Sequence, residues 1–419
     1  MHVYRRCVSV VISTFLVLSG AGRARAQDPQ MPEHHHPDAA AAATWTWTTD
    51  ASVFAGYNYQ HRKFTDFSAW ESQNWFMLAG QRTVGPGTFA FDVMTSLEPF
   101  TLKICQRLPN TPGCAHTGLG SPQVFQTGEA FQGAPLIDYQ HPHDLVMGLG
   151  ATYRVERGRL AYVFGAALVG SPALGPTPFM HRESGRDNPE APLAHHYTDS
   201  THITPGVLTA GVDAAGVALQ GSWFRGEEPN DNRLNIDRPR LDSWSARASW
   251  RRGPWRAQLS GGHVRRPEPF ELYDVSKLTA SIEFDGAVRS RPLAASLIWG
   301  ENREIHGILD GYLLEWKLGT TPHGWFYGRA ENVAKDLLDL GSPAPLGFVE
   351  FHHISHVAAL TLGYIHDVSE RRWGRIGVGG DTTFYRVGDN LLESYGAPHS
   401  FHVFVRYRPA AASAPAHVH

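Results

Sequence analysis

The sequence predicts an all-β protein that forms a single transmembrane antiparallel β-barrel of about 16 strands. Three observations lead to this fold class: an export signal at the N-terminus, strand-like segments in which apolar and polar residues alternate, and connections that are alternately short and long. Length alone would suggest two or three soluble domains. However, 42 glycines, 11% aromatic residues and the lack of a long helical period in the sequence favour one large β-structure.

The first 26 residues have the pattern of a secretory signal peptide. Arg5 and Arg6 precede an apolar run at 8–18, and an A-x-A cleavage site follows at 24–26. The apolar run is too short to cross a membrane as a helix, so we expect cleavage before Gln27. Removal takes away four arginines and no acids, so the formal net charge falls from −3 to −7. This acidic balance argues against a nucleic-acid partner.

The mature chain divides into a barrel and two short tails. Residues 27–43 are a His-rich, low-complexity segment that we expect to form a periplasmic tail. Residues 44–408 carry the strand pattern and form the predicted outer-membrane barrel, and residues 409–419 form a periplasmic C-terminal tail. The expected location is the outer membrane of a Gram-negative bacterium, reached through the signal peptide, with membrane lipid and lipopolysaccharide as partners.

Alternation is clearest in four segments. In 243–251, apolar residues at even positions alternate with Ser and Arg, and the same period runs through 145–156, 277–285 and 312–318. The strands of a soluble β-sandwich also alternate between apolar and polar residues, so the period alone does not distinguish a sandwich from a barrel. Aromatic residues at both ends of the apolar faces favour a barrel with interfacial girdles. The mean hydropathy of −0.29 fits a barrel, because only alternate residues face lipid.

The connections between the expected strands alternate in length. Seven tight ones are read at Val84–Gly87, Glu156–Arg159, Asp213–Gly216, Arg251–Pro254, Asp285–Ser290, Leu318–Gly324 and Asp367–Gly374. Eight long ones are read at 61–69, 98–143, 171–200, 227–240, 265–275, 301–307, 332–350 and 387–399. Together they join 16 strands, and the asymmetry is that of bacterial barrels with short periplasmic turns and long extracellular loops.

The last strand has the pattern of a barrel-closing strand. Phe401, Val403, Val405 and Tyr407 alternate with polar residues, which resembles the strand that the barrel-assembly machinery recognises. The usual pattern ends on the aromatic residue, whereas PAAASAPAHVH follows here.

The mature chain keeps two cysteines, Cys105 and Cys114, in the longest connection. An even pair in an exported protein predicts a disulfide. The bond would restrict a loop that no sheet holds. The loop either folds inward and narrows the lumen or lies on the surface.

Histidine is unusually frequent, with 23 residues, and many fall where the topology places the extracellular mouth. Imidazole groups beside carboxylates suit divalent transition ions such as copper or zinc. No HExxH or CxxC motif occurs, so the signal is compositional, and the alternative is that these side chains only pack the loops. The candidate metal ligands are His141, His143, His181, His195, His196 and His202.

Charged residues on the polar face of the strands are assigned to the lumen. Mixed charges in a barrel interior indicate either a hydrated path or a ladder of ion pairs that fills it. The residues assigned are Arg154, Glu156, Arg247, Glu283, Glu315, Lys317, Arg329 and Glu331.

Three strings give a resemblance that covers nearly the whole mature chain: QTGEAFQGAPLIDYQHPHDL (126–145), PFMHRESGRDNPEAPLAHHYTDSTHIT (178–204) and GSWFRGEEPNDNR (221–233). They resemble a family of proteobacterial outer-membrane β-barrel proteins whose activities are mostly unassigned. This family is loosely associated with heavy-metal (copper) resistance settings. The resemblance implies the location and leaves the activity open.

The best interpretation is a channel or receptor-like barrel that binds or passes transition-metal ions, small ions or solutes through a His-rich mouth. The sequence does not decide whether the barrel stays single or assembles as a homo-trimer. The alternatives are a structural or substrate-binding barrel without metal, and an outer-membrane hydrolase. An enzyme is not expected, because the GSW string at 221–223 is not a GxSxG elbow and no nucleophile lies in a known constellation.

Overall fold

The computed structural model describes residues 44–63, 66–107, 116–119, 125, 130–131, 134–135, 142–230, 232–267, 273–305, 307–335 and 354–410. Within these residues, no helix is both long enough and apolar enough to cross a membrane. The short helices are α2 (Glu98–Thr101), α3 (His195–Thr198), η3 (Ser200–His202), η4 (Asp389–Leu391) and α4 (Leu392–Tyr395).

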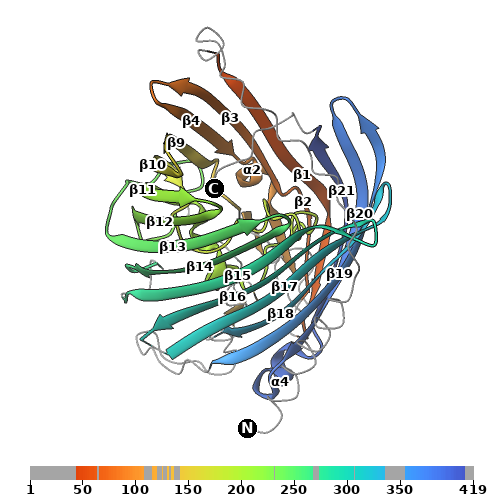
Figure 1. Ribbon diagram of the computed structural model, residues 1–419. Coiled ribbons are helices and arrows are strands. Elements are labelled where there is room, and N and C mark those ends of the chain that lie inside the picture. The colour runs from red at the N-terminus through yellow and green to blue at the C-terminus, as the bar shows by residue number, and fades with distance from the viewer. Residues whose placement is uncertain are drawn as a thin grey trace. The chain divides into compact units, whose positions relative to one another are not determined.

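Sixteen strand positions form a closed antiparallel barrel, which confirms the predicted fold class (Figure 1). Strands β2 (Asp66–Glu71) and β3 (Asn74–Val84) follow one another at a single position, since both pair with β1. The other positions are β1 (Thr46–His61), β4 (Gly87–Thr95), β9 (Val146–Arg157), β10 (Leu160–Gly170), β11 (Thr204–Ala214), β12 (Val217–Phe224), β13 (Ser243–Arg252), β14 (Trp255–Val264), β15 (Val275–Val288), β16 (Arg291–Glu304), β17 (Gly307–Thr321), β18 (Gly324–Lys335), β19 (Ser355–Arg371), β20 (Gly374–Val387) and β21 (His399–Pro409).

The barrel closes between its first and last strands. The second half of β1 pairs with β21 from Val53↔Tyr407 to His61↔His399, while its other edge pairs with β3 and β2. Closure leaves no long open sheet edge. Outside the ring, β5 (Lys103–Arg107) pairs with β2 and with β6 (His116–Leu119), and β7 (Ala130–Phe131) pairs with β8 (Ala134–Pro135).

The seven tight connections all lie where the sequence predicts them, and each has two residues between strands, as at Gly85–Pro86 and Gly253–Pro254. Gly85, Gly158 and Gly253 have φ of 57°, 63° and 56°, a conformation that glycine adopts at little cost. The prediction of a long connection at 301–307 was wrong. Strands β16 and β17 stay paired to Glu304↔Gly307, so only 305–306 join them.

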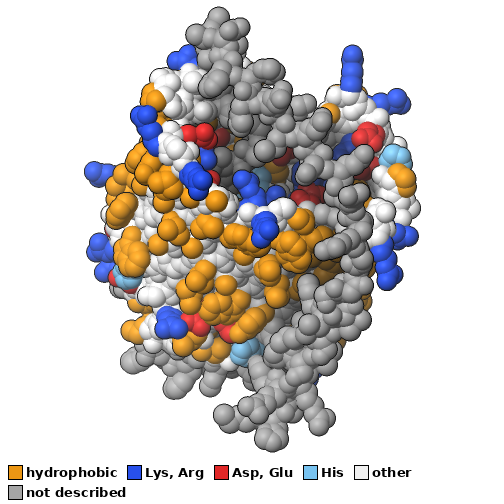
Figure 2. All heavy atoms as spheres, viewed as in Figure 1, with side chains coloured by type: hydrophobic (Ala, Val, Ile, Leu, Met, Phe, Trp, Pro, Cys, Tyr) orange, Lys and Arg blue, Asp and Glu red, His pale blue; other side chains and the backbone are white. Residues whose placement is uncertain are grey.

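The outer face of the barrel is apolar. Trp223 on β12 and Trp244 on β13 are paired, and they are 55% and 54% exposed. Figure 2 shows hydrophobic side chains gathered in a band across the strands, with Lys and Arg side chains along its edges. The inner face is polar and buried, as Ser260, Thr279 and Arg329 illustrate. This alternation of apolar outside and polar inside is that of a barrel embedded in lipid.

Candidate functional site

Residues 171–203, which join β10 to β11, fold into the barrel and are called the inserted segment (Figure 1, yellow-green). Its first residues follow the inner wall. The backbone N–H of Ala173 donates to Ser222 Oγ on β12, and that of Gly175 donates to Ser260 Oγ on β14, both at 2.8 Å. Its end, α3, packs against β15, β16 and β17. The segment therefore crosses the lumen from one wall to the other.

Two glycines on the wall allow α3 to approach closely. A Cβ added to Gly300 on β16 would lie 2.3 Å from the carbonyl oxygen of Tyr197. A Cβ added to Gly311 on β17 would lie 2.8 Å from the Tyr197 ring. The Tyr197 hydroxyl also donates to the carbonyl oxygen of Ala334. Together these contacts seat the helix on the barrel wall, because a larger residue at either glycine would force the backbones apart.

A buried ion network holds the middle of the segment. Arg182 is fully buried and donates to Asp199 on the same segment and to Glu315 on β17, each at 2.9 Å. Glu315 also accepts from Nε of Arg329 on β18 at 3.0 Å. One carboxylate thus bridges two guanidinium groups. Removing one partner of such a pair leaves an uncompensated buried charge, which is strongly destabilising.

Asp187 forms a second buried anchor. Its carboxylate contacts Lys317 at 2.9 Å, Arg408 at 3.3 Å and the Arg406 guanidinium. Burial alone would raise the pKa of Asp187, but Lys317 and Arg406 hold it well below its ordinary value. Glu183 beside it contacts Lys317 at 2.6 Å, and its pKa is also lowered, since the attraction of the cations exceeds the effect of burial.

Free space remains between the inserted segment and the opposite wall. A cavity of about 520 Å³ lies there, bordered by β1, β3 and the strands from β9 to β15. Five arginines and three acids line it: Arg154, Arg186, Arg247, Arg251, Arg256, Asp50, Asp213 and Glu283. Three of these arginines, Arg247, Arg251 and Arg256, form no salt bridge with any residue that the structure describes. Arg247 instead donates to the neutral Gln220 side chain at 2.8 Å. The cavity is therefore net positive.

Seven of the eight charged residues assigned to the lumen fall into two groups, and Glu156 belongs to neither. Glu315, Lys317, Arg329 and Glu331 are buried against the inserted segment, and Glu331 accepts the backbone N–H of Ala194 at 3.0 Å. Arg154, Arg247 and Glu283 line the cavity, while the Glu156 side chain is 77% exposed.

Four of the six candidate histidines come together near the start of β11. The ring centroids of His195 and His202 lie 5.1 Å apart, those of His143 and His202 5.5 Å, and those of His195 and His196 5.8 Å. Nδ1 of His143 contacts Glu98 at 2.8 Å. A cavity of about 50 Å³ adjoins all four rings. His143, His195 and His202 are buried, rather than exposed around a mouth.

Three groups at or beside these histidines have shifted pKa values. Asp199 contacts Nδ1 of His195 at 2.6 Å, and its pKa is lowered despite burial because His195 and Arg182 favour the carboxylate. Burial lowers the pKa of His202 well below its ordinary value. Burial also raises the pKa of Asp144 to about 6, although Arg233 lies 3.2 Å away.

The other candidates lie apart. The His181 ring packs on Trp75 with centroids 4.5 Å apart. His141 and Cys114 fall outside the described residues, and the side chain of Cys105 on β5 is not described. The disulfide stays a prediction. Across the described part of the chain, no group of three or more His, Cys, Asp or Glu side chains is arranged to hold a metal ion.

The sequence interpretation missed the inserted segment. It considered inward folding only for the connection 98–143, which lies largely outside the described residues. A usable signal was present in 178–202, which has a high density of charged and histidine residues between two apolar strands. Such residues are rarely buried unless they are paired. Their pairing with Glu315, Lys317 and Arg406 could not be read from one segment alone.

A closed barrel of sixteen strands with a segment folded into its lumen has the architecture of outer-membrane porins. The structure is similar to the anion-selective porin from Comamonas acidovorans, with a TM-score of 0.50 and 11% identity over 87% of this chain and 100% of that chain. It is also similar to Pseudomonas putida OprB, with a TM-score of 0.51 and 11% identity over 87% of this chain and 94% of that chain. No protein-family model and no curated protein matches the sequence. These likenesses concern the fold and give no support to an association with copper resistance.

Proposed function

We propose that the protein is a diffusion channel of the Gram-negative outer membrane that admits small solutes and prefers anions. The observation that carries the proposal is the net positive cavity of about 520 Å³ between the inserted segment and the wall. Fixed positive charge in a narrow space of low dielectric raises the local concentration of anions and repels cations. The similar porin from Comamonas acidovorans is named as anion-selective.

The proposal predicts an anion preference that depends on Arg247 and Arg256. Purified protein in planar bilayers should conduct, and its reversal potential in a salt gradient should give an anion-to-cation permeability ratio above one. In an R247Q/R256Q variant the ratio should fall toward one, because two lumen charges without a salt bridge in the described residues are removed.

Arg252 provides the matched control, because it pairs with Trp255 on the apolar outer face and is exposed. An R252Q variant should keep the parental ratio. Cation preference in the parent, or an equal change in R252Q, would contradict the proposal. A barrel that inserts but does not conduct would favour the structural or substrate-binding alternative.

A second candidate function is divalent transition-metal binding by His143, His195, His196 and His202. Its support is that Nδ1 of His143 and of His195 each faces a carboxylate, and Nδ1 of His202 faces a backbone carbonyl at 2.9 Å. Such contacts orient metal-binding imidazoles in known sites. Since the rings do not form a metal site in the conformation described, binding requires them to reorient.

For this candidate, an H143A/H196A variant should bind zinc more weakly than the parent in calorimetry above pH 7. Binding should weaken as the pH falls through about 6.5, since only neutral imidazole is a ligand. An H323A/H366A variant removes two rings at the opposite end of the barrel and serves as control. Equal zinc affinity in H143A/H196A and parent would exclude the site.

Several expectations about processing and partners remain proposals. Residues 1–43 and 411–419 lie outside the described residues, so signal cleavage and the two tails stay predictions, although the last strand includes Pro409. Assembly as a homo-trimer, contact with lipopolysaccharide and insertion by the barrel-assembly machinery follow from the proposed location.

A further inference from the structure

Methionine has an uneven distribution in this barrel. The chain has six methionines, and the four that follow residue 43 are Met77, Met94, Met147 and Met180. All four belong to one buried cluster, formed by strands β3, β4, β9 and β10 and by the inserted segment. Residues separated by about a hundred positions in the chain are thus gathered at one place on the inner wall.

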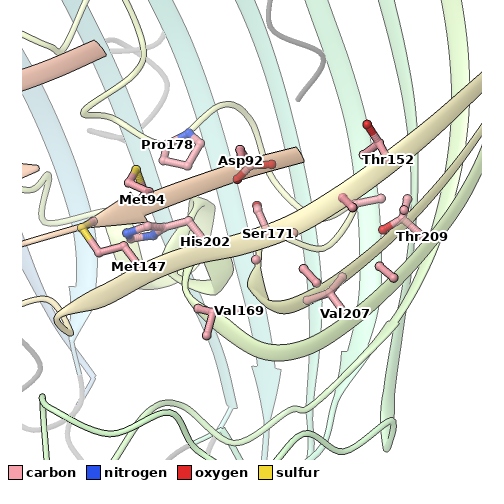
Figure 3. A pocket seen from close by; sticks show the side chains of 18 of the residues that line it. Asp92, Met94, Met147, Thr152, Val169, Ser171, Pro178, His202, Val207 and Thr209 are labelled. Carbon is pink, nitrogen blue, oxygen red and sulfur yellow. The ribbon is translucent and has the colours of Figure 1, made fainter. Parts of the chain in front are cut away.

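A cavity of about 180 Å³ adjoins this cluster and extends along β9 and β10 (Figure 3). Met77, Met94 and Met147 line the cavity together with His202, and Figure 3 labels Met94, Met147 and His202 among the side chains that border it. Asp92 lines the same cavity. Three thioethers, the imidazoles of His181 and His202, and a carboxylate therefore line one cavity.

The His202 imidazole is held in a fixed orientation. Its Nδ1 lies 2.9 Å from the carbonyl oxygen of Asp199, so Nδ1 carries the hydrogen and donates it. Nε2 then bears a lone pair. This atom is buried and has no hydrogen-bond partner among the described residues, although His202 is only 7% exposed. A buried acceptor without a partner is uncommon and needs an explanation, and a bound ion is one.

We propose that Met94, Met147 and His202 form a binding site for a soft monovalent metal ion, Cu⁺ or Ag⁺. Thioether sulfur is a soft ligand that selects Cu⁺ over hard ions, and neutral imidazole suits copper as well. The Nδ1 contact to Asp199 supplies the outer support that orients a metal-binding ring. The carboxylate of Asp92 offsets the charge of the ion. No electron transfer is involved, because the ion binds in the oxidation state in which it arrives.

The plain alternative is packing. Methionine fills irregular gaps in apolar cores, and the cluster also holds Trp75 and Phe179. Packing accounts for the sulfur atoms but not for an imidazole acceptor and a carboxylate on the same cavity. The site goes beyond the proposed channel function, and its test measures binding. A failure of anion selectivity and a failure of this site can therefore be told apart.

The test uses the full mature protein and measures Cu⁺ under ascorbate by competition with the chromogenic chelator bicinchoninate, with Ag⁺ as a redox-inert second probe. M94L/M147L keeps the side-chain volume and removes both sulfur atoms. H202N removes Nε2 while its amide can still donate to Asp199. Each variant should lose one equivalent of bound Cu⁺ or weaken it on the order of 100-fold. Histidines in the tails contribute equally to every variant.

Met180 provides the matched control, since it belongs to the same cluster but does not line this cavity. M180L should bind Cu⁺ as the parent does, and equimolar Zn²⁺ should not displace Cu⁺. The proposal is overturned if M94L/M147L or H202N binds like the parent. It is also overturned if M180L loses as much affinity, which would indicate a packing effect, or if Zn²⁺ competes equally.

Discussion

Replacing Glu315 with Gln should release the inserted segment from the barrel wall and raise single-channel conductance to a clearly larger level. Glu315 is buried and accepts from both Arg182 and Arg329 at 2.9–3.0 Å. The neutral amide leaves the buried Arg329 guanidinium without the carboxylate that pairs with it, and it leaves Arg182 with Asp199 as its remaining carboxylate partner. Breaking a buried pair in this way costs about 3–5 kcal/mol. That is enough to favour a state in which the segment leaves the lumen, while the hydrogen-bonded strands hold the barrel together.

The matched control for this prediction is Glu156→Gln. Glu156 lies 3.7 Å from Arg154, but its side chain is 77% exposed, so the pair contributes little. E156Q should conduct at the parental level, and both variants should migrate as folded barrels in unheated electrophoresis. Parental conductance in a folded E315Q would show that the ion network does not hold the segment.

The barrel could be predicted because its signal is local and repeated. Each strand shows its two-residue period within about ten residues, as in 243–251, and each tight turn carries glycine or another turn residue. The error at 301–307 has a physical reason. Glu301, Asn302 and Arg303 are polar, but they continue the β16–β17 ladder past the apolar band, and polarity alone does not end a strand.

The inserted segment could not be predicted because its partners are distant in sequence. Arg182 and Glu315 are separated by 133 positions, and Lys317 and Glu183 by 134. A single sequence shows that a loop is charged but not which wall it meets. The histidines illustrate the same limit. Topology placed 141–143 and 195–202 near one another, but the burial of His143, His195 and His202 depends on how the segment folds inward.

The methionine cluster shows a further gap in the sequence interpretation, which ranked candidate metal ligands by histidine content. Met94 and Met147 stand on separate strands without a motif, so each reads as an ordinary apolar position. Only the pairing of β4 with β9, which sets Met94 opposite Gly148, brings them to the same cavity as His202.

The inserted segment should stay anchored across neutral and mildly acid pH and be released only in strong acid, below the ordinary carboxyl pKa of about 4. The pKa of Asp187 is lowered in the folded protein by Lys317 and Arg406. A lowered folded-state pKa stabilises the anchor above the ordinary value, and this contribution is lost as the pH falls toward the folded pKa. Conductance recorded from pH 8 to pH 3 should therefore be constant and then rise at the acid end. D187N, which cannot ionise, should show the higher conductance already at pH 7, and its conductance should no longer rise in acid to the same extent. A parental conductance that rises between pH 7 and pH 5, or a D187N variant that behaves like the parent at pH 7, would show that Asp187 is not the anchor.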